Sequence, residues 1–299
     1  MAASETAVRA GRRRVRISNP DKVLFPDDGL TKADLASYYA AVAPAMVPHV
    51  RDRPLNLWRW NRGIDGELVV QRAIPKGAPE WVKRVTVARR RGGEVCHAVG
   101  GEAATLVWLA NQNCITPHVW TARADRPDHP DRIVFDFDPP DDGDGQFEAI
   151  REGALALGDL LRSRGLTPYA MTSGSRGLHV VAPLRRGPDS DRVRAVAGEL
   201  AEEVADRLPR ELTTSWRKAG RGGRVLVDAA RNTYAQTAVA PYAVRAKAGA
   251  PVATPLAWEE LEDSDLTPRR WTLATVPQRL EERGDPWAGI GRAAASLPS

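Results

Sequence analysis

The sequence predicts a mixed α/β (α+β) fold built around a sheet of the split βαβ type. Between residues 133 and 228, apolar runs and amphipathic helical patterns follow one another as strand, helix, strand, strand, helix, strand. That order is typical of ferredoxin-like sheets. Hydrophobic residues make up 42% of the 299-residue chain and charged residues 27%, as in ordinary globular proteins. A chain of this length can form one large core or two smaller ones.

The N-terminal part of the chain is expected to form an α/β module over about residues 17–130. Thr31 and Asp34 have the spacing of a capping box, and the apolar residues after them recur at helical spacing. We therefore expect a helix that starts at Thr31, is kinked at Pro44 and closes near Pro48. Strands and a hairpin with an arginine-rich tip are expected to follow, at residues 54–60, 67–72 and 85–107.

The central sheet, over about residues 131–250, has the most regular pattern. Its strands, helices and connecting turn are expected, in chain order, at residues 133–138, 147–165, 168–172, 173–177, 178–184, 190–208 and 224–228. The acidic run at 141–145 is interpreted as a polar loop. A C-terminal segment, 251–299, completes the single domain expected over 17–299. The arginine-rich residues 1–16 are expected to form a flexible basic tail, with nucleic-acid contact as an alternative.

Charge and cysteine content narrow the class of protein. The net charge of +5 comes with a large excess of arginine over lysine, which favours a polyanionic partner because guanidinium groups bind phosphate through two hydrogen bonds. A GC-rich genome would give the same composition. Cys96 and Cys114 lack CxxC spacing, so neither a disulfide framework nor a zinc knuckle is expected. No apolar run reaches the roughly 18–20 residues of a membrane span, and we expect a cytoplasmic protein with no membrane partner.

Two aspartates at the end of a strand carry the first chemical signal. Side chains alternate between the faces of a strand, so Asp136 and Asp138 point one way while Phe135 and Phe137 point into the core. Adjacent carboxylates repel each other unless a cation neutralises them, and their hard oxygens suit Mg²⁺ or Mn²⁺. Asp228 ends another strand of the same expected sheet, and three carboxylates are enough for two metal ions. The alternative is a group of solvated acids beside a Pro-Pro turn.

A glycine-rich turn and a basic segment flank these carboxylates in the expected sheet. The turn at 173–177 offers backbone N–H groups, hydroxyls and Arg176, and His179 follows two residues later. These groups could hold a triphosphate, although a plain hairpin turn has the same pattern. The basic segment at 218–232 suits either phosphate binding or surface ion pairs next to Asp228. Two metal ions about 3.5–4 Å apart would support in-line phosphoryl transfer.

Together the motifs resemble one family, the polymerase domain of bacterial DNA ligase D, a branch of the archaeo-eukaryotic primase superfamily. The resemblance covers nearly the whole chain, with motifs at residues 18–26, 31–32, 38–39, 53–55, 135–139, 172–179, 239–245 and 284–287. It implies an archaeo-eukaryotic primase-like fold in which the central sheet is an RRM-like palm. It also implies a DNA-dependent nucleotidyltransferase that extends a DNA primer, with two Mn²⁺ or Mg²⁺ ions and an NTP or dNTP substrate.

The resemblance assigns roles to individual residues. The catalytic metal ligands that it implies are Asp136, Asp138 and Asp228. The nucleotide-binding residues that it implies are His118, Ser173, Arg176, His179, Arg221, Arg231 and Arg245. Lys22 and Lys32 match the lysines with which family members hold the 5′-phosphate of the downstream strand in gapped DNA. The chain departs from the family at Val69 and Val70, where two template-stacking phenylalanines are frequent, and at Arg176, where a lysine is expected.

The resemblance also implies a biological role and leaves alternatives. Family members favour ribonucleotides, often work with Mn²⁺ and fill short gaps, which implies repair by end joining with Ku and a separate ATP-dependent DNA ligase, or excision repair. The length leaves no room for ligase or nuclease domains, so we expect a stand-alone polymerase. One alternative is a non-catalytic or degenerate nucleic-acid-binding repair module. The other is a phosphatase-like phosphotransferase, which Asp228 and the position of Pro140 disfavour.

Overall fold

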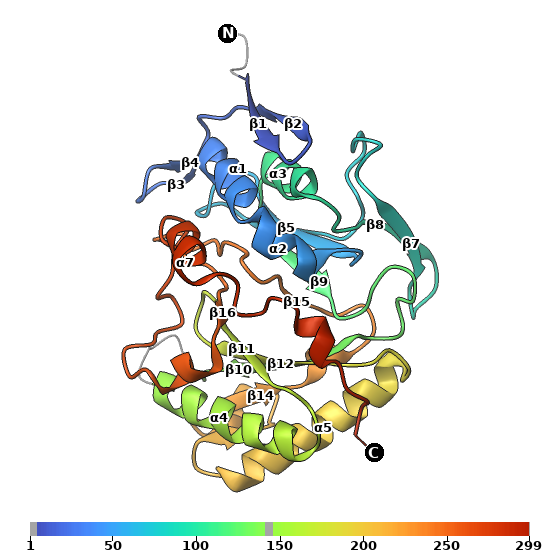
Figure 1. The fold of residues 1–299 in the computed structure, drawn as a ribbon, viewed down its shortest axis with the longest axis vertical. Coiled ribbons are helices and arrows are strands. Elements are labelled where there is room, and N and C mark those ends of the chain that lie inside the picture. Colours follow the sequence, from blue (N-terminus) through green and yellow to red (C-terminus); the bar gives the residue numbers. More distant parts are fainter. Residues whose placement is uncertain (1–4, 141–145, 299) are drawn as a thin grey trace. The chain divides into compact units, whose positions relative to one another are not determined.

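The protein is described here by a computed structural model covering residues 5–140 and 146–298. The chain divides into two compact units, each built from segments that are distant in sequence (Figure 1). The first unit comprises Met1–Trp120, Val239–Ala253 and Trp271–Gly284, and the second comprises Thr121–Ala238, Thr254–Arg270 and Asp285–Ser299. This division differs from the expected run of consecutive parts with boundaries near 130 and 250, because later segments return to the core of the first unit.

The first unit is an α/β module around an antiparallel sheet in which β5 pairs with both β6 and β9. Its elements in chain order are β1 (Glu5–Ala10), β2 (Arg13–Ser18), β3 (Val23–Phe25), β4 (Leu30–Thr31), α1 (Lys32–Ala41), α2 (Ala43–Val50), β5 (Leu55–Trp60), β6 (Leu68–Gln71), β7 (Arg84–Ala88), β8 (Glu94–Ala98), α3 (Ala103–Asn111), β9 (Cys114–Trp120) and α7 (Val276–Arg283). The hydroxyl of Tyr38 donates to the carbonyl oxygen of Tyr242 at 2.9 Å. The returning segment Val239–Ala253 is therefore part of this core.

The N-terminal residues differ from the expected flexible tail. Residues 5–18 form an antiparallel hairpin of β1 and β2, and the residues before Glu5 lie outside the described part of the chain. Val15 and Ile17 are buried, whereas Arg14 and Arg16 are exposed. This alternation gives the hairpin one apolar face that packs on the unit and one arginine-rich face. The expectation of a tail over 1–16 is wrong for residues 5–16.

The helix expected from Thr31 is two helices. α1 begins where predicted, with Thr31 and Asp34 forming a capping box. It ends at Ala41, and α2 begins at Ala43 with Pro44 in its first turn. Proline is tolerated there because the first N–H groups of a helix have no partner within the helix, so the predicted kink is a break between two helices.

The second unit contains the predicted palm sheet. Its elements are β10 (Arg132–Asp138), α4 (Phe147–Ser163), β11 (Tyr169–Thr172), β12 (Leu178–Pro183), α5 (Ser190–Arg207), β13 (Leu212–Thr213), α6 (Lys218–Arg221), β14 (Val225–Asp228), β16 (Pro255–Leu256) and the 3₁₀ helices η2 (Ala230–Asn232), η3 (Trp258–Glu262) and η4 (Ile290–Ala293). The strand order is β13-β14-β10-β12-β11-β16. β10, β11, β12 and β14 pair antiparallel and form the split βαβ arrangement, so the predicted fold class is confirmed.

The two long helices of the second unit pack against one face of this sheet (Figure 1). Phe135 and Phe137 are fully buried on that face. A Cβ atom at Gly153 of α4 would lie 2.9 Å from the ring of Phe137, so the glycine allows the helix to approach the strand closely. Side chains alternate along a strand, and Asp136 and Asp138 therefore lie on the opposite face of the sheet.

Two further parts of the chain complete the description. β15 (Thr237–Val239) spans the point in the sequence where the chain passes from the second unit back to the first. The run at 141–145, expected to be a polar loop, lies outside the described residues. Within the described ranges, no helix combines the length and the apolar character that crossing a membrane requires.

Candidate active site

Three aspartates lie together on the face of the palm sheet opposite α4 and α5. In the strand register, Asp136 of β10 stands opposite Asp228 of β14 on one side and His179 of β12 on the other. Asp138 lies two residues further along β10 and shares the same face. The side chains of Asp136 and Asp228 are 15% and 5% exposed, and that of Asp138 is 36% exposed. The structure thus brings the three predicted carboxylates together.

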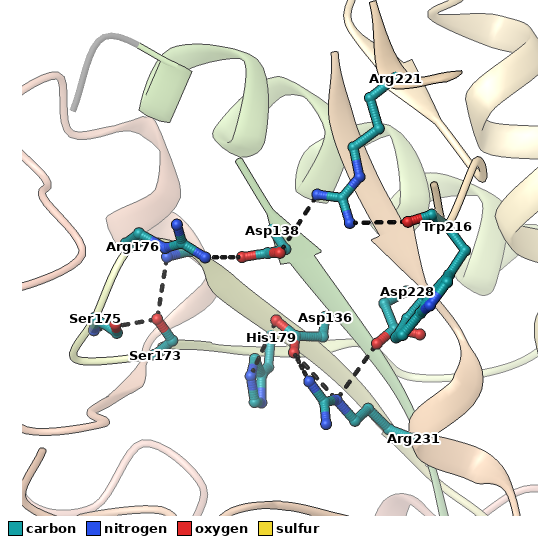
Figure 2. Close-up of polar contacts among 11 residues, drawn as sticks. Asp136, Asp138, Ser173, Ser175, Arg176, His179, Trp216, Arg221, Asp228 and Arg231 are labelled. Carbon is teal, nitrogen blue, oxygen red and sulfur yellow. Dashed lines mark hydrogen bonds and ion pairs between the residues drawn. The ribbon is translucent and has the colours of Figure 1, made fainter. Parts of the chain in front are cut away.

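Arg231 and His179 compensate the charge of Asp136 (Figure 2). Nη2 of Arg231 and Nε2 of His179 lie 3.1 and 3.3 Å from carboxylate oxygens of Asp136. Burial raises the pKa of Asp136, but the charges and hydrogen bonds of His179 and Arg231 outweigh burial. The pKa of Asp136 is therefore well below its ordinary value, and this residue is held as a carboxylate.

For Asp228, unlike Asp136, the effect of burial on the pKa exceeds that of the neighbouring positive charge. Its carboxylate accepts the backbone N–H of Ala230 at 2.7 Å and lies 3.5 Å from Nε of Arg231. Burial raises the pKa of Asp228 above its ordinary value, and repulsion from Asp136 and Asp138 adds to the rise. The negative charge of Asp228 is therefore only partly compensated, and an additional cation beside it would be stabilising.

Asp138 connects two segments that come from different parts of the unit. Nη2 of Arg176, in the turn between β11 and β12, lies 3.0 Å from its Oδ1 atom. Nη1 of Arg221, in α6, lies 3.5 Å from its Oδ2 atom. Arg221 is buried and also donates to the carbonyl oxygen of Trp216 at 3.5 Å. Two predicted phosphate-binding arginines thus flank one predicted metal ligand (Figure 2).

The turn between β11 and β12 is organised by Ser173. Its Oγ atom accepts hydrogen bonds from the backbone N–H groups of Ser175 and Gly177, at 3.2 and 3.1 Å. These two N–H groups serve the turn itself, which corrects the expectation that they are open to a ligand. A Cβ atom at Gly177 would lie 1.9 Å from the carbonyl oxygen of Phe137. Only glycine therefore lets the turn approach the strand that carries Asp136 and Asp138.

Asn232 is a positioning residue that the sequence reasoning missed. Its side-chain amide accepts from the N–H of Val134 at 2.8 Å and donates to the carbonyl oxygens of Val134 and Ala229 at 2.7 and 2.9 Å. The side chain is fully buried. It therefore fastens the segment after Asp228 to β10. A lone asparagine has no spacing signal, so the sequence alone could not have identified this role.

The donor set of the site suits a hard divalent cation. Three carboxylates share one face, and burial together with the neighbouring carboxylates raises the pKa of Asp228, so a cation beside it would be favoured. Over residues 5–140 and 146–298, however, no three His, Cys, Asp or Glu side chains converge on one point. The carboxylate oxygens are instead directed toward arginines, Arg231 above all. A metal ion would have to compete with these guanidinium groups.

The predicted 5′-phosphate residues belong to the first unit. Lys32 is buried at the start of α1, and its Nζ atom donates to the carbonyl oxygen of Ser18 at 2.8 Å. The Nζ atom of Lys22 donates to the carbonyl oxygen of Asn61. Burial, together with the charges of Lys22 and Arg59, lowers the pKa of Lys32 to about 8. An anion would relieve the repulsion among these three positive charges. Arg59 was not among the residues expected from the sequence.

The start of α1 contributes little to an anion site. The backbone N–H groups of its first residues are already used, because those of Lys32, Ala33 and Asp34 donate to oxygens of Lys22, Pro20 and Thr31. Asp34 also places a negative charge in the first turn. The positive character of this region therefore comes from side chains rather than from the end of the helix.

His118 and Arg245 are also residues of the first unit. His118 is buried on β9, and its ring stacks on that of Trp58 with centroids 3.9 Å apart and planes 10° apart. Arg245 is half-buried in the returning segment, where its N–H donates to the carbonyl oxygen of Pro251 at 2.7 Å. Val69 and Val70 lie on β6 with 39% and 46% exposure.

Comparison with known proteins identifies the family. Residues 31–287 match the family model of the LigD primase-polymerase domain. The chain belongs to this family. It is therefore an enzyme of the primase-polymerase, or nucleotidyltransferase, class. A solved structure described as the polymerase domain of Mycobacterium tuberculosis ligase D in complex with DNA is similar to the chain with a TM-score of 0.86 and 33% identity, over 95% of this chain and 100% of that one.

Full-length LigD proteins are similar over most of the chain. The multifunctional non-homologous end joining protein LigD of Mycobacterium bovis is 35% identical over 285 residues, which are 92% of this chain and 37% of that protein. The protein of the same description from Pseudomonas aeruginosa is 33% identical over 96% of this chain and 34% of its own length. The chain thus spans little more than a third of these two LigD proteins.

Proposed function

We propose that this chain extends a DNA primer by metal-dependent nucleotidyl transfer, with Asp136, Asp138 and Asp228 as metal ligands. The observation that carries the proposal is the cross-strand pairing of Asp136 with Asp228, with Asp138 on the same face, in a palm sheet of the LigD primase-polymerase family. DNA as the template and primer is supported by the related ligase D polymerase domain, whose structure contains DNA.

The residues of the palm have different roles in the proposed reaction. Bound Mn²⁺ or Mg²⁺ would supply Lewis-acid activation of the primer hydroxyl and charge stabilisation of the leaving pyrophosphate. Arg176 and His179, from the β11–β12 hairpin, bind the triphosphate oxygens of the incoming NTP or dNTP. Ser173 shapes the turn that joins β11 to β12. Arg221 and Arg231 exchange their ion pairs with the aspartates for contacts with the phosphates of the substrate. The charge of the site therefore stays balanced. The family resemblance also assigns nucleotide binding to His118 and Arg245.

Primer extension tests this proposal directly. Wild-type protein with Mn²⁺ should extend a primer annealed to a template, and chelation should abolish extension. Asp136→Ala, Asp138→Ala or Asp228→Ala should each lower extension by at least about 10³-fold, since one lost ligand disrupts the metal pair, while DNA affinity changes little. A wild-type protein that binds primer-template without extending it would instead support a non-catalytic repair module.

Two finer properties belong to the same proposal. The family resemblance favours ribonucleotides over deoxyribonucleotides and Mn²⁺ over Mg²⁺, and direct competition between an NTP and the matching dNTP measures the first preference. The relatives named for non-homologous end joining support a role in that pathway. Ku and a separate ATP-dependent DNA ligase as partners, and a site of action in the cytoplasm, are proposed from the family resemblance alone. Excision repair is the second candidate pathway.

We further propose that Lys22 and Lys32 bind the 5′-phosphate of the downstream strand at a short gap. The observation that supports this role is the depressed pKa of Lys32 beside Lys22 and Arg59, because an anion would relieve the crowding of positive charge. Replacing Lys22 and Lys32 by alanine should remove the advantage of phosphorylated over unphosphorylated gaps. Extension on an open template-primer should change little, whereas an equal loss on both substrates would contradict phosphate binding.

A further inference from the structure

Trp216 is an exposed aromatic side chain beside the three aspartates. It is 64% exposed, the highest value among the exposed large hydrophobic residues of the described chain. Its segment connects β13 to β14, and its carbonyl oxygen accepts from Arg221, which in turn contacts Asp138. An indole is costly to leave in water, and here the ring is exposed while the backbone carbonyl is contacted by Arg221. The side chain is therefore available to a ligand.

The surroundings of Trp216 suit a nucleobase with its attached phosphates. Trp216 lies next to Asp228 (Figure 2). Both residues line a cavity of about 430 Å³, together with Thr214, Leu226 and Ala230. The α5 wall of this cavity carries three acidic residues, Asp191, Glu199 and Glu202, against one arginine, Arg194, so its net charge is negative. Those charges disfavour a phosphate inside the cavity but not an uncharged base. Outside it, Arg217 and Lys218 are exposed directly after the indole and can meet the backbone phosphates.

The order of strands gives the direction from which each substrate arrives. Arg176 and His179, which hold the triphosphate in the proposed reaction, lie on the β12 side of Asp136. Asp228 and Trp216 lie on its β14 side. In phosphoryl transfer the attacking and leaving oxygens are roughly in line. With the triphosphate held by the β11–β12 hairpin, the primer hydroxyl is placed on the β14 side, where Trp216 stands, and Arg221 and Arg231 serve the reacting phosphate between the two substrates.

We propose that Trp216 is a base-stacking residue that holds the 3′-terminal base of the primer beside Asp228. The inference rests on the proposed nucleotidyl transfer and adds to it a residue that positions the primer end. Stacking on an aromatic side chain is sequence-tolerant because every base has a π face, so Trp216 holds any terminal base. In this chain, where Val69 and Val70 replace an aromatic pair, it supplies an aromatic contact at a different place.

A substrate-by-variant experiment tests the proposal with the full-length chain. Wild type, Trp216→Ala, Trp216→Leu and Trp216→Phe are compared on two primers, one ending in a normal nucleotide and one in an abasic nucleotide. Removing the terminal base costs every enzyme its pairing to the template, so the informative quantity is the ratio of the two kcat/KM values. Trp216→Leu is the matched control, because it keeps apolar area without a ring. The affinity for both primers is also measured by fluorescence anisotropy without nucleotide.

Stacking predicts a specific pattern of ratios. The abasic penalty should be about 5- to 150-fold larger in wild type than in Trp216→Ala, which is the effect of a stacking contact of about 1–3 kcal/mol. Trp216→Phe should keep most of the penalty, and Trp216→Leu should behave like Trp216→Ala. An abasic site in the template, opposite the incoming nucleotide, should cost all four proteins equally.

Other outcomes separate this inference from the proposed function. Equal abasic penalties in all four proteins, with normal primers extended by wild type, would overturn the stacking role and leave nucleotidyl transfer intact. A penalty difference found only with the template abasic site would overturn the assignment to the primer. A wild-type protein that extends neither primer would overturn the proposed function, and the role of Trp216 with it.

Discussion

Arg231 neutralises the two carboxylates, Asp136 and Asp228, that we propose as metal ligands. Replacing Arg231 by alanine should lower the free energy of unfolding by about 1–3 kcal/mol in the absence of divalent ions, because two adjacent carboxylates lose a shared cation that is itself one-third exposed. Mn²⁺ should then raise the Tm of the variant more than that of wild type, since the metal takes over the lost charge. Thermal unfolding with and without Mn²⁺ measures both effects.

The matched control for this prediction is Arg207→Ala. Arg207 forms an exposed ion pair with Glu203 on α5, at 2.7 Å, and exposed pairs contribute little. Its Tm and its response to Mn²⁺ should match those of wild type. An equal Mn²⁺ response in Arg231→Ala and wild type would mean that the arginine and the metal do not compete for the same carboxylates.

Lys32 gives the proposed 5′-phosphate site a pH dependence. Its pKa is lowered to about 8 by burial and by the neighbouring charges of Lys22 and Arg59. A phosphate binds the protonated lysine and raises its pKa, so the affinity is highest below pH 8 and falls as the pH rises through that value. The ratio of gap filling with and without a 5′-phosphate should therefore decline between pH 7 and pH 9. A ratio that stays constant over this range would exclude Lys32 as the titrating contact.

At the scale of elements, the β11–β12 hairpin depends on Gly177. A Cβ atom there would lie 1.9 Å from the carbonyl oxygen of Phe137, so Gly177→Ala should push the turn away from β10 and carry Arg176 with it. We expect a stability loss of about 1–3 kcal/mol and a loss of extension larger than this destabilisation explains. Gly187→Ala is the control, since a Cβ atom at that position meets nothing within 4 Å. Normal extension by Gly177→Ala would show that the turn does not position the nucleotide.

The elements of the palm could be predicted because each has its own period or boundary signal. β10 ends in Asp-Phe-Asp before two prolines, and α4 and α5 show clear apolar faces with caps or glycines near their ends. The register that sets Asp136 opposite Asp228 could not be read from the sequence, because cross-strand pairing depends on which residues of two distant strands meet. The contacts of Arg231 and Asn232 depend on that register and were equally out of reach.

Two elements of the first unit escaped prediction for a different reason. α3 is buried along most of its length, so its sequence lacks the polar face that reveals a helical period. β9 is buried at all seven positions, and a continuous apolar strand shows no alternation either. The hairpin was expected to extend to residue 107, but β8 ends at Ala98 and α3 begins at Ala103. The expected range was too long because the start of α3 has no clear helical pattern. In β1 and β2 the excess of arginine concealed the alternation of buried residues.

At the scale of the whole molecule, the first unit needs segments from the second half of the chain. A fragment of residues 1–120 would lack Val239–Ala253 and Trp271–Gly284. The hydroxyls of Tyr38 and Thr116 would then lose the carbonyl oxygens of Tyr242 and Val244, which they contact at 2.9 and 2.7 Å. We expect this fragment to show no cooperative thermal unfolding by circular dichroism, because buried donors lose their partners and the core loses apolar side chains. A sharp transition in the fragment would contradict this expectation.

The chain passes between its two units five times, after residues 120, 238, 253, 270 and 284. At the level of the gene, this repeated passage between the units limits which recombination events between related genes give a stable protein. A single crossover between two related genes that falls inside the coding sequence gives a protein in which at least one unit is a mosaic of both parents, and contacts such as that of Tyr38 with Tyr242 then join residues of different origin. Selection on such contacts favours inheritance of the two units as one block. Sequence changes in the returning segments should accordingly track those in the N-terminal residues that they contact.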